Sequence, residues 1–175
     1  MENLPRGESS VIVVNHRSTA DIFFAPLFTP LNTAVFVRAW PFKIWIFKWF
    51  MRGAGYIDIE STPLPEFFES AGRALSERGV SFLFFPEGHR SRDGRLQRFK
   101  SGAFLTSEEF NIPIVPVVLT GTETFLSMRD NLFRPAVVKV EILPPIDPAT
   151  FPAERRALKL RRHVESIFKE HLHES

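Results

Sequence analysis

The sequence contains no cysteine. A chain without cysteine forms no disulfide bond, binds no metal through thiolates and has no thiol nucleophile, and such a composition favours a reducing compartment. Net charge is also nearly absent, because 22 Lys and Arg residues oppose 20 Asp and Glu residues and leave +2 at pH 7. A charge balance this close argues against binding to a nucleic-acid backbone. We therefore expect no nucleic-acid partner.

Long apolar runs are missing as well. The longest uncharged run covers 16 residues, from Ile22 to Val37, and two prolines and an asparagine interrupt it. A membrane-spanning helix needs about 20 consecutive apolar residues. The first eight residues include two glutamates and a proline, where a secretory signal has a basic and then an apolar region. The sequence therefore predicts neither a transmembrane helix nor a signal peptide.

Several catalytic and binding motifs are absent from the sequence. It has no G-x-S-x-G, so the nucleophile of an α/β serine hydrolase is missing. It has neither G-x-x-x-x-G-K-[ST] nor G-x-G-x-x-G, which disfavours nucleotide and dinucleotide binding. His16, Asp21, Glu87 and His89 do not have a recognisable metal-ligand spacing. We therefore expect no metal site and no bound nucleotide or dinucleotide.

Aromatic rings without a hydroxyl group are abundant. The sequence has 19 Phe and 3 Trp but 1 Tyr. Apolar rings in this number fit a protein core, and they also fit a surface that contacts lipid or an acyl chain. Phe23 and Phe24 directly follow Asp21, and we expect them to face the core or an acyl chain.

Strands and helices alternate along the chain. The length of 175 residues corresponds to a single domain, 1–175. Short β-branched or aromatic runs predict strands, and apolar residues at helical spacing predict helices. Strands are expected at 11–14, 33–38, 55–59, 81–85, 112–119 and 136–143, and helices at 18–30, 41–52, 65–78, 102–110 and 153–171. The fold class is therefore α/β, with a largely parallel central sheet flanked by helices.

His16 and Asp21 follow the first predicted strand. On one continuous helix their spacing would place them about 140° apart, on different faces. If His16 lies in the turn after the strand and Asp21 in the first helical turn, the carboxylate can reach the imidazole, fix its tautomer and stabilise its charged form. That is the arrangement of a general base. The alternative is a capping turn, in which Asp21 accepts from helix N–H groups and His16 is merely exposed.

A loop rich in arginine follows the predicted strand 81–85. Residues 86–95 hold three arginines, two carboxylates and a histidine around Gly88 and Gly94. Arginine presents a planar fork to phosphate or carboxylate, and glycine lets the backbone approach a ligand closely. The loop therefore predicts an anion-binding site, with a solvated charged turn as the alternative.

These segments together resemble the glycerolipid acyltransferase family, typified by bacterial 1-acylglycerol-3-phosphate acyltransferase. Residues 15–21, NHRSTAD, are similar to its N-H-x-x-x-x-D block, and residues 85–91, FPEGHRS, to its F-P-E-G-x-R-S block. Residues 99–103, FKSGA, and 114–122, IVPVVLTGT, are similar to the segments that follow in that family. The blocks stand in the family's order over most of the chain.

The resemblance implies a reaction. A fatty acyl group passes from acyl-CoA or acyl carrier protein to a hydroxyl of a lysolipid, in membrane lipid biosynthesis, without metal, cofactor or acyl-enzyme. His16 is implied to be the general base that deprotonates the acceptor hydroxyl, while Asp21 holds its ring. A thioester is already activated, so proximity and proton removal are the main contributions required of the enzyme.

The resemblance also implies the substrate-binding residues. Glu87, Gly88 and Arg90 are implied to bind the polar head of the acceptor. Gly121 and Thr122 are implied to shape the site near it.

One position departs from the family pattern. The second block of the family places an arginine after an aromatic, an aliphatic and an aspartate, where it helps to hold the acceptor phosphate. Here residues 56–58, YID, are followed by Ile59. An aliphatic side chain cannot pair with a phosphate. The acceptor is therefore expected to be lysophosphatidate or a lyso-aminolipid, and this departure favours the lyso-aminolipid.

Membrane contact is expected at another segment. Family members commonly carry apolar N-terminal docking helices, which we expect to be absent here because His16 stands close to the start of the sequence. Residues 42–52, FKIWIFKWFMR, mix apolar bulk with cations as an interfacial helix does, and Trp40, Trp45 and Trp49 cluster there. We expect this helix to dock the protein peripherally on the cytoplasmic face of the cell membrane. The alternative is a core helix covered by lysine stems.

Two other functions remain open. The first is a non-enzymatic lipid-binding protein on the same fold, which the intact pair of His16 and Asp21 disfavours. The second is a hydrolase in which His16 activates water, so that a thioester is consumed without an acceptor.

Overall fold

The computed structural model describes residue 3 and residues 7–30, 32–37, 57–58, 63–91, 95–126 and 132–173. The predicted helix 41–52, with its tryptophan cluster, and Ile59 lie outside these residues. Within the described part of the chain, no helix combines the length and the apolar character that crossing a bilayer requires.

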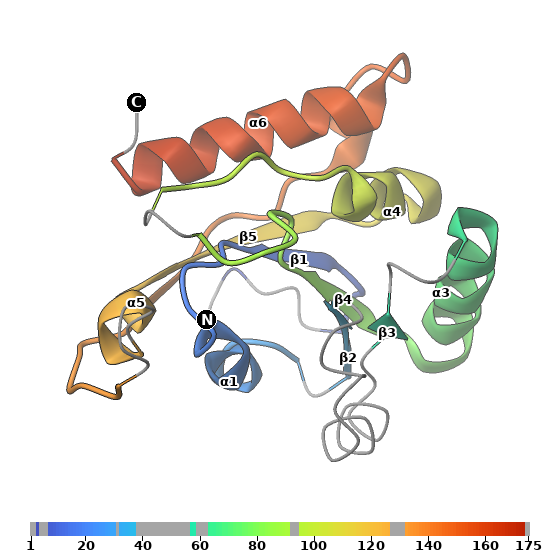
Figure 1. The fold of residues 1–175 in the computed structure, drawn as a ribbon. Helices are drawn as coiled ribbons and strands as arrows, with labels where there is room; N and C mark the ends of the chain where they lie inside the picture. The colour runs from blue at the N-terminus through green and yellow to red at the C-terminus, as the bar shows by residue number, and fades with distance from the viewer. Residues whose placement is uncertain are drawn as a thin grey trace.

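A six-stranded sheet forms the centre of the molecule (Figure 1). Its strands are β1 (Val11–Val14), β2 (Thr33–Val37), β3 (Ile57–Asp58), β4 (Ser81–Phe84), β5 (Ile114–Thr120) and β6 (Lys139–Ile142). They lie in the order β3-β2-β4-β1-β5-β6, and every neighbouring pair is parallel except β5 and β6. The prediction of a largely parallel α/β sheet is confirmed.

The helices match their predicted positions where the sequence is strongly periodic. The helical segments are α1 (Asp21–Phe24), η1 (Ala25–Leu27), α3 (Leu64–Arg78), α4 (Gly102–Phe110), α5 (Thr122–Phe125), η3 (Pro148–Thr150) and α6 (Arg156–His171). Helix α3 ends at Gly79, whose left-handed φ of 57° lets its N–H bond back to the Leu75 carbonyl. Helix α6 buries Ala157, Leu160, Val164 and Phe168, as its apolar stripe predicts.

The first helix differs from its prediction. It begins at Asp21 and ends, through η1, at Leu27, and its N-cap position is Ala20, with no side-chain cap bond. Ser18 is engaged elsewhere, since its hydroxyl donates to the Leu126 carbonyl and accepts from the Ala20 N–H. Ser18 and Thr19 are of the residue types that favour the N-cap position, but neither caps this helix.

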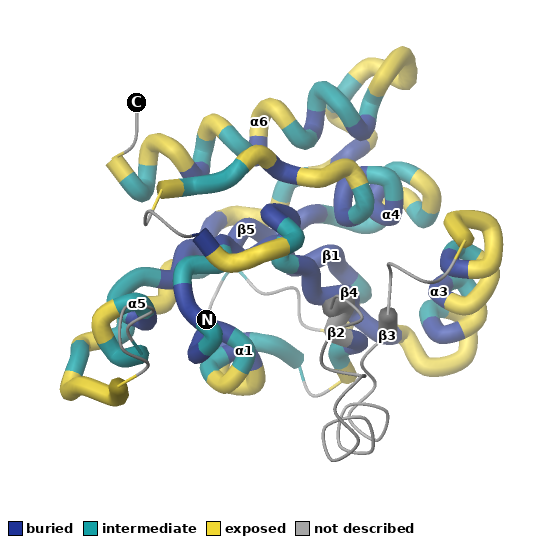
Figure 2. The backbone as a smooth tube through the Cα atoms, viewed as in Figure 1, coloured by how far each residue is buried: buried dark blue, intermediate teal, exposed yellow. Residues whose placement is uncertain are grey.

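Both faces of the sheet are covered, and the residues of β1 alternate between them. Val11 and Val13 belong to the core that includes α3, α4 and α6, while Ile12 and Val14 face the core that includes Ala25 of η1. Figure 2 shows the buried sheet between these exposed helical layers. Burial on both sides explains why β1 and β4 are continuous apolar runs instead of alternating sequences.

The chain leaves two neighbouring strands toward opposite faces. The parallel strand β1 leads into α1 and η1 on one face, and its neighbour β4 leads into α4 on the other. In parallel sheets, ligands bind in the crevice that such a divergence opens at the carboxyl ends of the strands. The segments after β1 and β4 are those that carry His16 and Glu87.

Candidate active site

Asn15 fixes the start of the site loop to the sheet. It is fully buried, its Nδ2 donates to the Leu119 carbonyl at 2.8 Å, and its Oδ1 accepts from the Leu119 N–H at 2.7 Å. A side-chain amide can donate and accept at the same time, so Asn15 substitutes for a missing pair of sheet hydrogen bonds between the ends of β1 and β5. Sequence reasoning did not place Asn15 in the site. Its position directly after a buried strand was the available signal.

His16 and Asp21 are in direct contact. His16 lies in the loop after β1 and Asp21 is the first residue of α1, and the His16 Nδ1 to Asp21 Oδ2 distance is 2.8 Å. Oδ2 also accepts from the backbone N–H groups of Arg17 at 2.7 Å and Ser18 at 2.8 Å. The predicted folding back of the carboxylate onto the imidazole is therefore present.

These contacts determine the tautomer of His16. Because Oδ2 is already an acceptor for two backbone N–H groups, Nδ1 of His16 donates to it, and in the neutral imidazole Nε2 carries the lone pair. The Asp21 side chain is 1% exposed and that of His16 is 21% exposed. Phe85 packs on the imidazole with the ring centroids 4.6 Å apart. The result is an oriented, partly accessible imidazole beside a fully buried carboxylate.

Glu87 lies beneath the same loop. Its Oε1 accepts from the His16 N–H at 2.6 Å and its Oε2 accepts from the Gln97 N–H at 2.8 Å, and the residue is 2% exposed. The Ser91 N–H donates to the His16 carbonyl at 2.8 Å and adds a second link between the two loops. Both carboxylate oxygens of Glu87 are thus engaged by the backbone, which differs from the direct contact with an acceptor head implied by the resemblance.

Burial raises the pKa of Glu87 to about 7, although its backbone hydrogen bonds and the charges of His16 and Arg17 lower it. A carboxyl with a raised folded-state pKa contributes most stability below its unfolded value of 4.5 and loses that contribution as the pH rises through about 7. Glu87→Gln removes this titration. From about pH 5 to about pH 8, we expect the stability advantage of the wild type over Glu87→Gln to fall by roughly 2–3 kcal/mol.

Urea unfolding of both proteins across this pH range measures the effect. Glu77→Gln, at an exposed position on α3, is the matched control for the loss of a carboxyl. A stability difference between wild type and Glu87→Gln that does not change with pH would show that burial does not govern the ionisation of this group.

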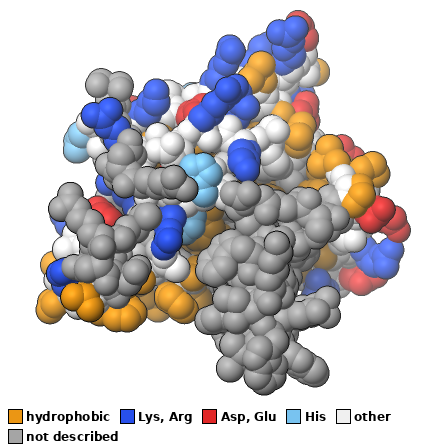
Figure 3. All heavy atoms as spheres, in the orientation of Figure 1, with side chains coloured by type: hydrophobic (Ala, Val, Ile, Leu, Met, Phe, Trp, Pro, Cys, Tyr) orange, Lys and Arg blue, Asp and Glu red, His pale blue; other side chains and the backbone are white. Residues whose placement is uncertain are grey.

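Cations gather around the loop that follows β4. Arg90 is exposed and its Nη1 donates to the hydroxyl of Thr19, which ties this loop to the loop carrying His16. Gly88 has a φ of +73°, and a Cβ at this position would lie 2.7 Å from Nζ of Lys100. The exposed Lys100 therefore lies directly over Gly88. From the sequence, Lys100 was noted only within the segment FKSGA and was not predicted as a site residue. Figure 3 shows lysine and arginine side chains beside histidine atoms on this face.

Gly121 and Thr122 lie where β5 passes into α5. Gly121 has a φ of +89°, and a Cβ there would lie 2.2 Å from the Val137 carbonyl oxygen, so the position requires glycine. Thr122 is fully buried as the first residue of α5. Arg17 Nη1 lies 3.7 Å from Glu123 Oε1, which places α5 against the loop of His16. The short helix α5 was not predicted from the sequence.

The predicted site residues therefore fall into one region of the fold. His16 and Asp21 form a bonded pair, Glu87 and Arg90 contact their loop, and Gly121 begins the segment that packs on it. Over the ranges that the structure describes, no group of three or more His, Cys, Asp or Glu side chains is placed to hold a metal ion.

Comparisons with known proteins show which family the chain resembles. A family model described as Acyltransferase matches residues 1–120. A 1-acyl-sn-glycerol-3-phosphate acyltransferase of Limnanthes douglasii is 34% identical over 143 residues, covering 79% of this chain and 50% of that protein. The Saccharomyces cerevisiae protein of the same name is 31% identical over 150 residues, covering 83% of this chain and 49% of that protein. The chain thus spans about half the length of the curated relatives it matches.

A solved structure is similar in fold. The crystal structure of the 1-acyl-sn-glycerophosphate acyltransferase PlsC from Thermotoga maritima superimposes with a TM-score of 0.81 at 29% sequence identity. The match covers 98% of this chain and 68% of that chain.

Proposed function

The chain belongs to the acyltransferase family, and from this premise we propose that it transfers a fatty acyl group from a thioester to a hydroxyl of a lysophospholipid in phospholipid biosynthesis. The observation that carries the proposal is the bonded pair of His16 and Asp21 at the carboxyl end of β1. The similarity to acyltransferases supplies the reaction class for this pair.

The proposed step begins with proton removal. Nε2 of His16 takes the proton of the acceptor hydroxyl as its oxygen attacks the thioester carbonyl carbon. The carbon–sulfur bond breaks, the acyl group remains on the acceptor oxygen as an ester, and the sulfur leaves as a thiolate that recovers the proton from the imidazolium. Asp21 stabilises that imidazolium through the 2.8 Å bond to Nδ1. Acyl-CoA and acyl carrier protein are both donors compatible with this step.

In this proposal Glu87 acts on the loop instead of on the substrate. Its bond to the His16 N–H holds the backbone from which the imidazole projects. Gly88 leaves room for the Lys100 side chain beside the acceptor, and Gly121 and Thr122 form the wall at α5. The protein is proposed to work peripherally at the cytoplasmic face of the membrane, where its acceptor resides.

The acceptor is proposed to be 1-acylglycerol-3-phosphate, the compound in the names of the relatives. Arg90 and Lys100 are the cations next to Gly88 and are proposed to hold its phosphate. The replacement of the family arginine by Ile59 supports the second candidate, a lyso-aminolipid.

Arg90→Ala is expected to raise the KM for the phosphate-bearing acceptor about 10- to 100-fold with a smaller effect on kcat, since a hydrogen bond to a charged group contributes about 1.5–3 kcal/mol. Steady-state kinetics with varied acceptor at saturating thioester measure the change. Arg73→Ala removes an exposed arginine of α3 and is the matched control. An unchanged KM in Arg90→Ala would remove this arginine from the acceptor site.

An acceptor panel tests the proposed function. The purified protein is supplied with thioesters of coenzyme A and of acyl carrier protein, and with lysophosphatidate, lyso-ornithine lipid or lysophosphatidylcholine. The proposal predicts diacyl product with lysophosphatidate as the fastest acceptor. Faster acylation of the lyso-ornithine lipid would transfer the assignment to the second candidate, and thioester loss without any acylated product would indicate a hydrolase.

A further inference from the structure

Large apolar side chains are exposed in two segments close to the active site. Phe23 is 67% and Leu27 64% exposed on α1 and η1, while Leu132 is 57% and Phe133 69% exposed in the segment after α5. Of the seven exposed large hydrophobic side chains among the described residues, five lie in residues 23–27 and 132–137. Of the two alternatives expected for Phe23, the core and an acyl chain, its exposure excludes the core, whereas Phe24 is partly buried.

Aromatic contacts join these two segments into one surface. The Phe24 and Phe125 ring centroids are 5.5 Å apart, and those of Phe125 and Phe133 are 5.4 Å apart, both edge to face. We call the set of Phe23, Leu27, Phe125, Leu132 and Phe133 the α1–α5 apolar surface. Figure 3 shows hydrophobic side chains gathered on this side of the molecule, below α1 and α5. Exposed patches of this kind mark interaction sites on soluble domains.

The surface begins at the active site. Asp21, which holds His16, is the first residue of α1, and the segment from Asp21 to Leu27 is a single short helical run. At the rise of α- and 3₁₀-helices, this run extends roughly 10 Å. The interfacial zone of a bilayer is several ångströms deep on each side of the hydrocarbon core. Side chains of the α1–α5 apolar surface that reach the acyl boundary would thus leave His16 at the level of the lipid headgroups.

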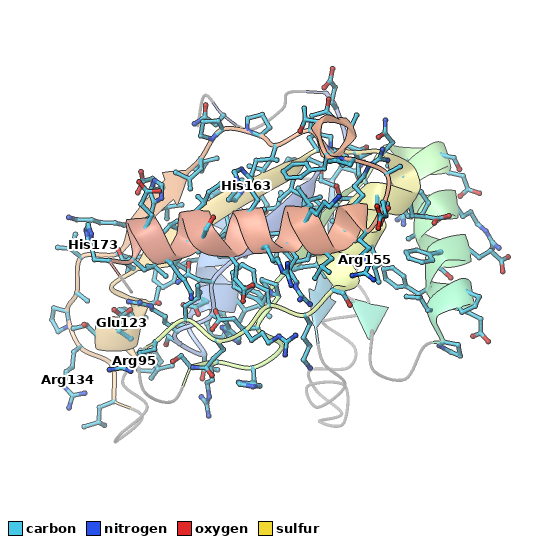
Figure 4. All side chains as sticks on the ribbon, turned by 90° about the horizontal axis from the view of Figure 1, so that it is seen from above. Arg95, Glu123, Arg134, Arg155, His163 and His173 are labelled. Carbon is cyan, nitrogen blue, oxygen red and sulfur yellow. The ribbon has the colours of Figure 1, made fainter. Side chains whose placement is uncertain are left out.

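An exposed arginine adjoins the surface. Arg134 directly follows Phe133, is exposed, and donates its backbone N–H to the Phe125 carbonyl at 2.9 Å. Figure 4 labels Glu123 and Arg134 at the α5 end of the molecule. Glu123 is itself 3.7 Å from Arg17. Apolar side chains beside an exposed arginine are a combination that an anionic lipid surface attracts.

We propose that the α1–α5 apolar surface docks on an anionic lipid bilayer and thereby brings His16 to the headgroup level, where a lysolipid hydroxyl is presented. The proposal rests on the proposed function, because it takes the acceptor to be a membrane lipid. It assigns membrane contact to residues different from the predicted helix 41–52.

A single fluorescent label tests the contact directly. Since the sequence has no cysteine, Phe133→Cys creates one labelling site for an environment-sensitive fluorophore. Adding vesicles of phosphatidylcholine and phosphatidylglycerol is expected to shift the emission to the blue. Leu64→Cys, which replaces a 50% exposed leucine at the start of α3, is the control and is expected to show no shift. Equal shifts at both positions, or none at Phe133→Cys, would overturn the proposal.

Vesicle cosedimentation supplies a second measurement. Each large apolar side chain that no longer enters the interface is expected to weaken binding about tenfold. The variant Phe23→Ser with Phe133→Ser is therefore expected to bind these vesicles about 100-fold more weakly than the wild type, while Leu64→Ser binds like the wild type. Arg134→Glu is expected to lose binding to vesicles with phosphatidylglycerol.

Activity assays separate this proposal from the proposed function. With a short-chain acceptor that is soluble as a monomer, the double variant is expected to keep the activity of the wild type, and with vesicle-embedded acceptor it is expected to lose it. Wild-type activity of the double variant on vesicles would overturn docking and leave acyl transfer intact. Absence of transfer to either acceptor by the wild type would instead overturn the proposed function. Dimer dissociation in the double variant without loss of vesicle binding would assign the surface to a second copy of the chain.

Discussion

His16→Ala lowers kcat for acyl transfer by about 10²–10⁴-fold, the contribution that a positioned general base makes. The imidazole is the group whose Nε2 lone pair is directed away from the buried carboxylate, since Nδ1 is engaged by Asp21 at 2.8 Å. A thioester is activated without help from the protein, so proton removal from the acceptor is the step that the variant loses. Single-turnover transfer from thioester to lysophosphatidate measures the loss.

The variant must remain folded for this result to be informative. The His16 side chain is 21% exposed, and the backbone bonds of this residue to Glu87 and Ser91 do not involve the ring. We expect the far-ultraviolet circular dichroism and vesicle binding of His16→Ala to match the wild type. His89→Ala, which removes an exposed histidine from the neighbouring loop, is the matched control and is expected to keep full kcat. Undiminished transfer by His16→Ala would exclude this residue as the base.

Asp21→Asn lowers kcat to a similar extent, by about 10²–10⁴-fold, because a neutral amide cannot stabilise the imidazolium or enforce the tautomer. It also weakens the fold. Oδ2 accepts from His16 Nδ1 and from the N–H groups of Arg17 and Ser18, and a neutral oxygen accepts all three less strongly. Since charged hydrogen bonds contribute about 1.5–3 kcal/mol each, we expect unfolding to become easier by about 2 kcal/mol.

Two readouts separate catalysis from stability in this variant. Urea unfolding gives the change in free energy, and kcat measured well below the unfolding transition gives the change in catalysis. Asp147→Asn is the control, because Asp147 accepts a backbone N–H bond from Ala149 at an exposed helix start far from His16 in the sequence. An Asp21→Asn variant that loses stability but keeps kcat would reduce Asp21 to a structural capping residue, the alternative weighed from the sequence.

Local sequence patterns predicted the parts of the fold that depend on local interactions. The buried run of β1, the apolar stripe of α6 and the glycine stop of α3 are each specified by residues within one element. The conformation of the loop between β1 and α1 could also be predicted, because the short spacing of His16 and Asp21 limits how their side chains can meet.

Contacts between residues that lie far apart in the sequence could not be predicted from local patterns. Ser18 bonds to Leu126, and Asn15 bonds to Leu119, each across more than 100 residues of sequence. These partners explain why Ser18 does not cap α1 and why the loop after β1 is fixed.

The hydrogen-bond partners of the Glu87 carboxylate also could not be predicted from the sequence. The sequence resemblance placed its carboxylate toward the acceptor, and only the structure puts both oxygens on backbone N–H groups of two separate loops. A carboxylate in a glycine-bearing loop can bind a ligand or the backbone, and sequence alone does not distinguish these outcomes. Exposure likewise could not be read from composition, since Phe23 and Phe24 are adjacent but differ in burial.

The central claim is that the protein transfers an acyl group to an acceptor through His16. The most direct measurement follows thiol release from a fatty acyl thioester, with and without lysophosphatidate, and identifies the acylated product by mass spectrometry. The account predicts thiol release that depends on the acceptor, matches the diacyl product in amount, and falls by about 10²–10⁴-fold in His16→Ala. Thiol release that continues without acceptor, yields free fatty acid or is undiminished in His16→Ala would contradict it.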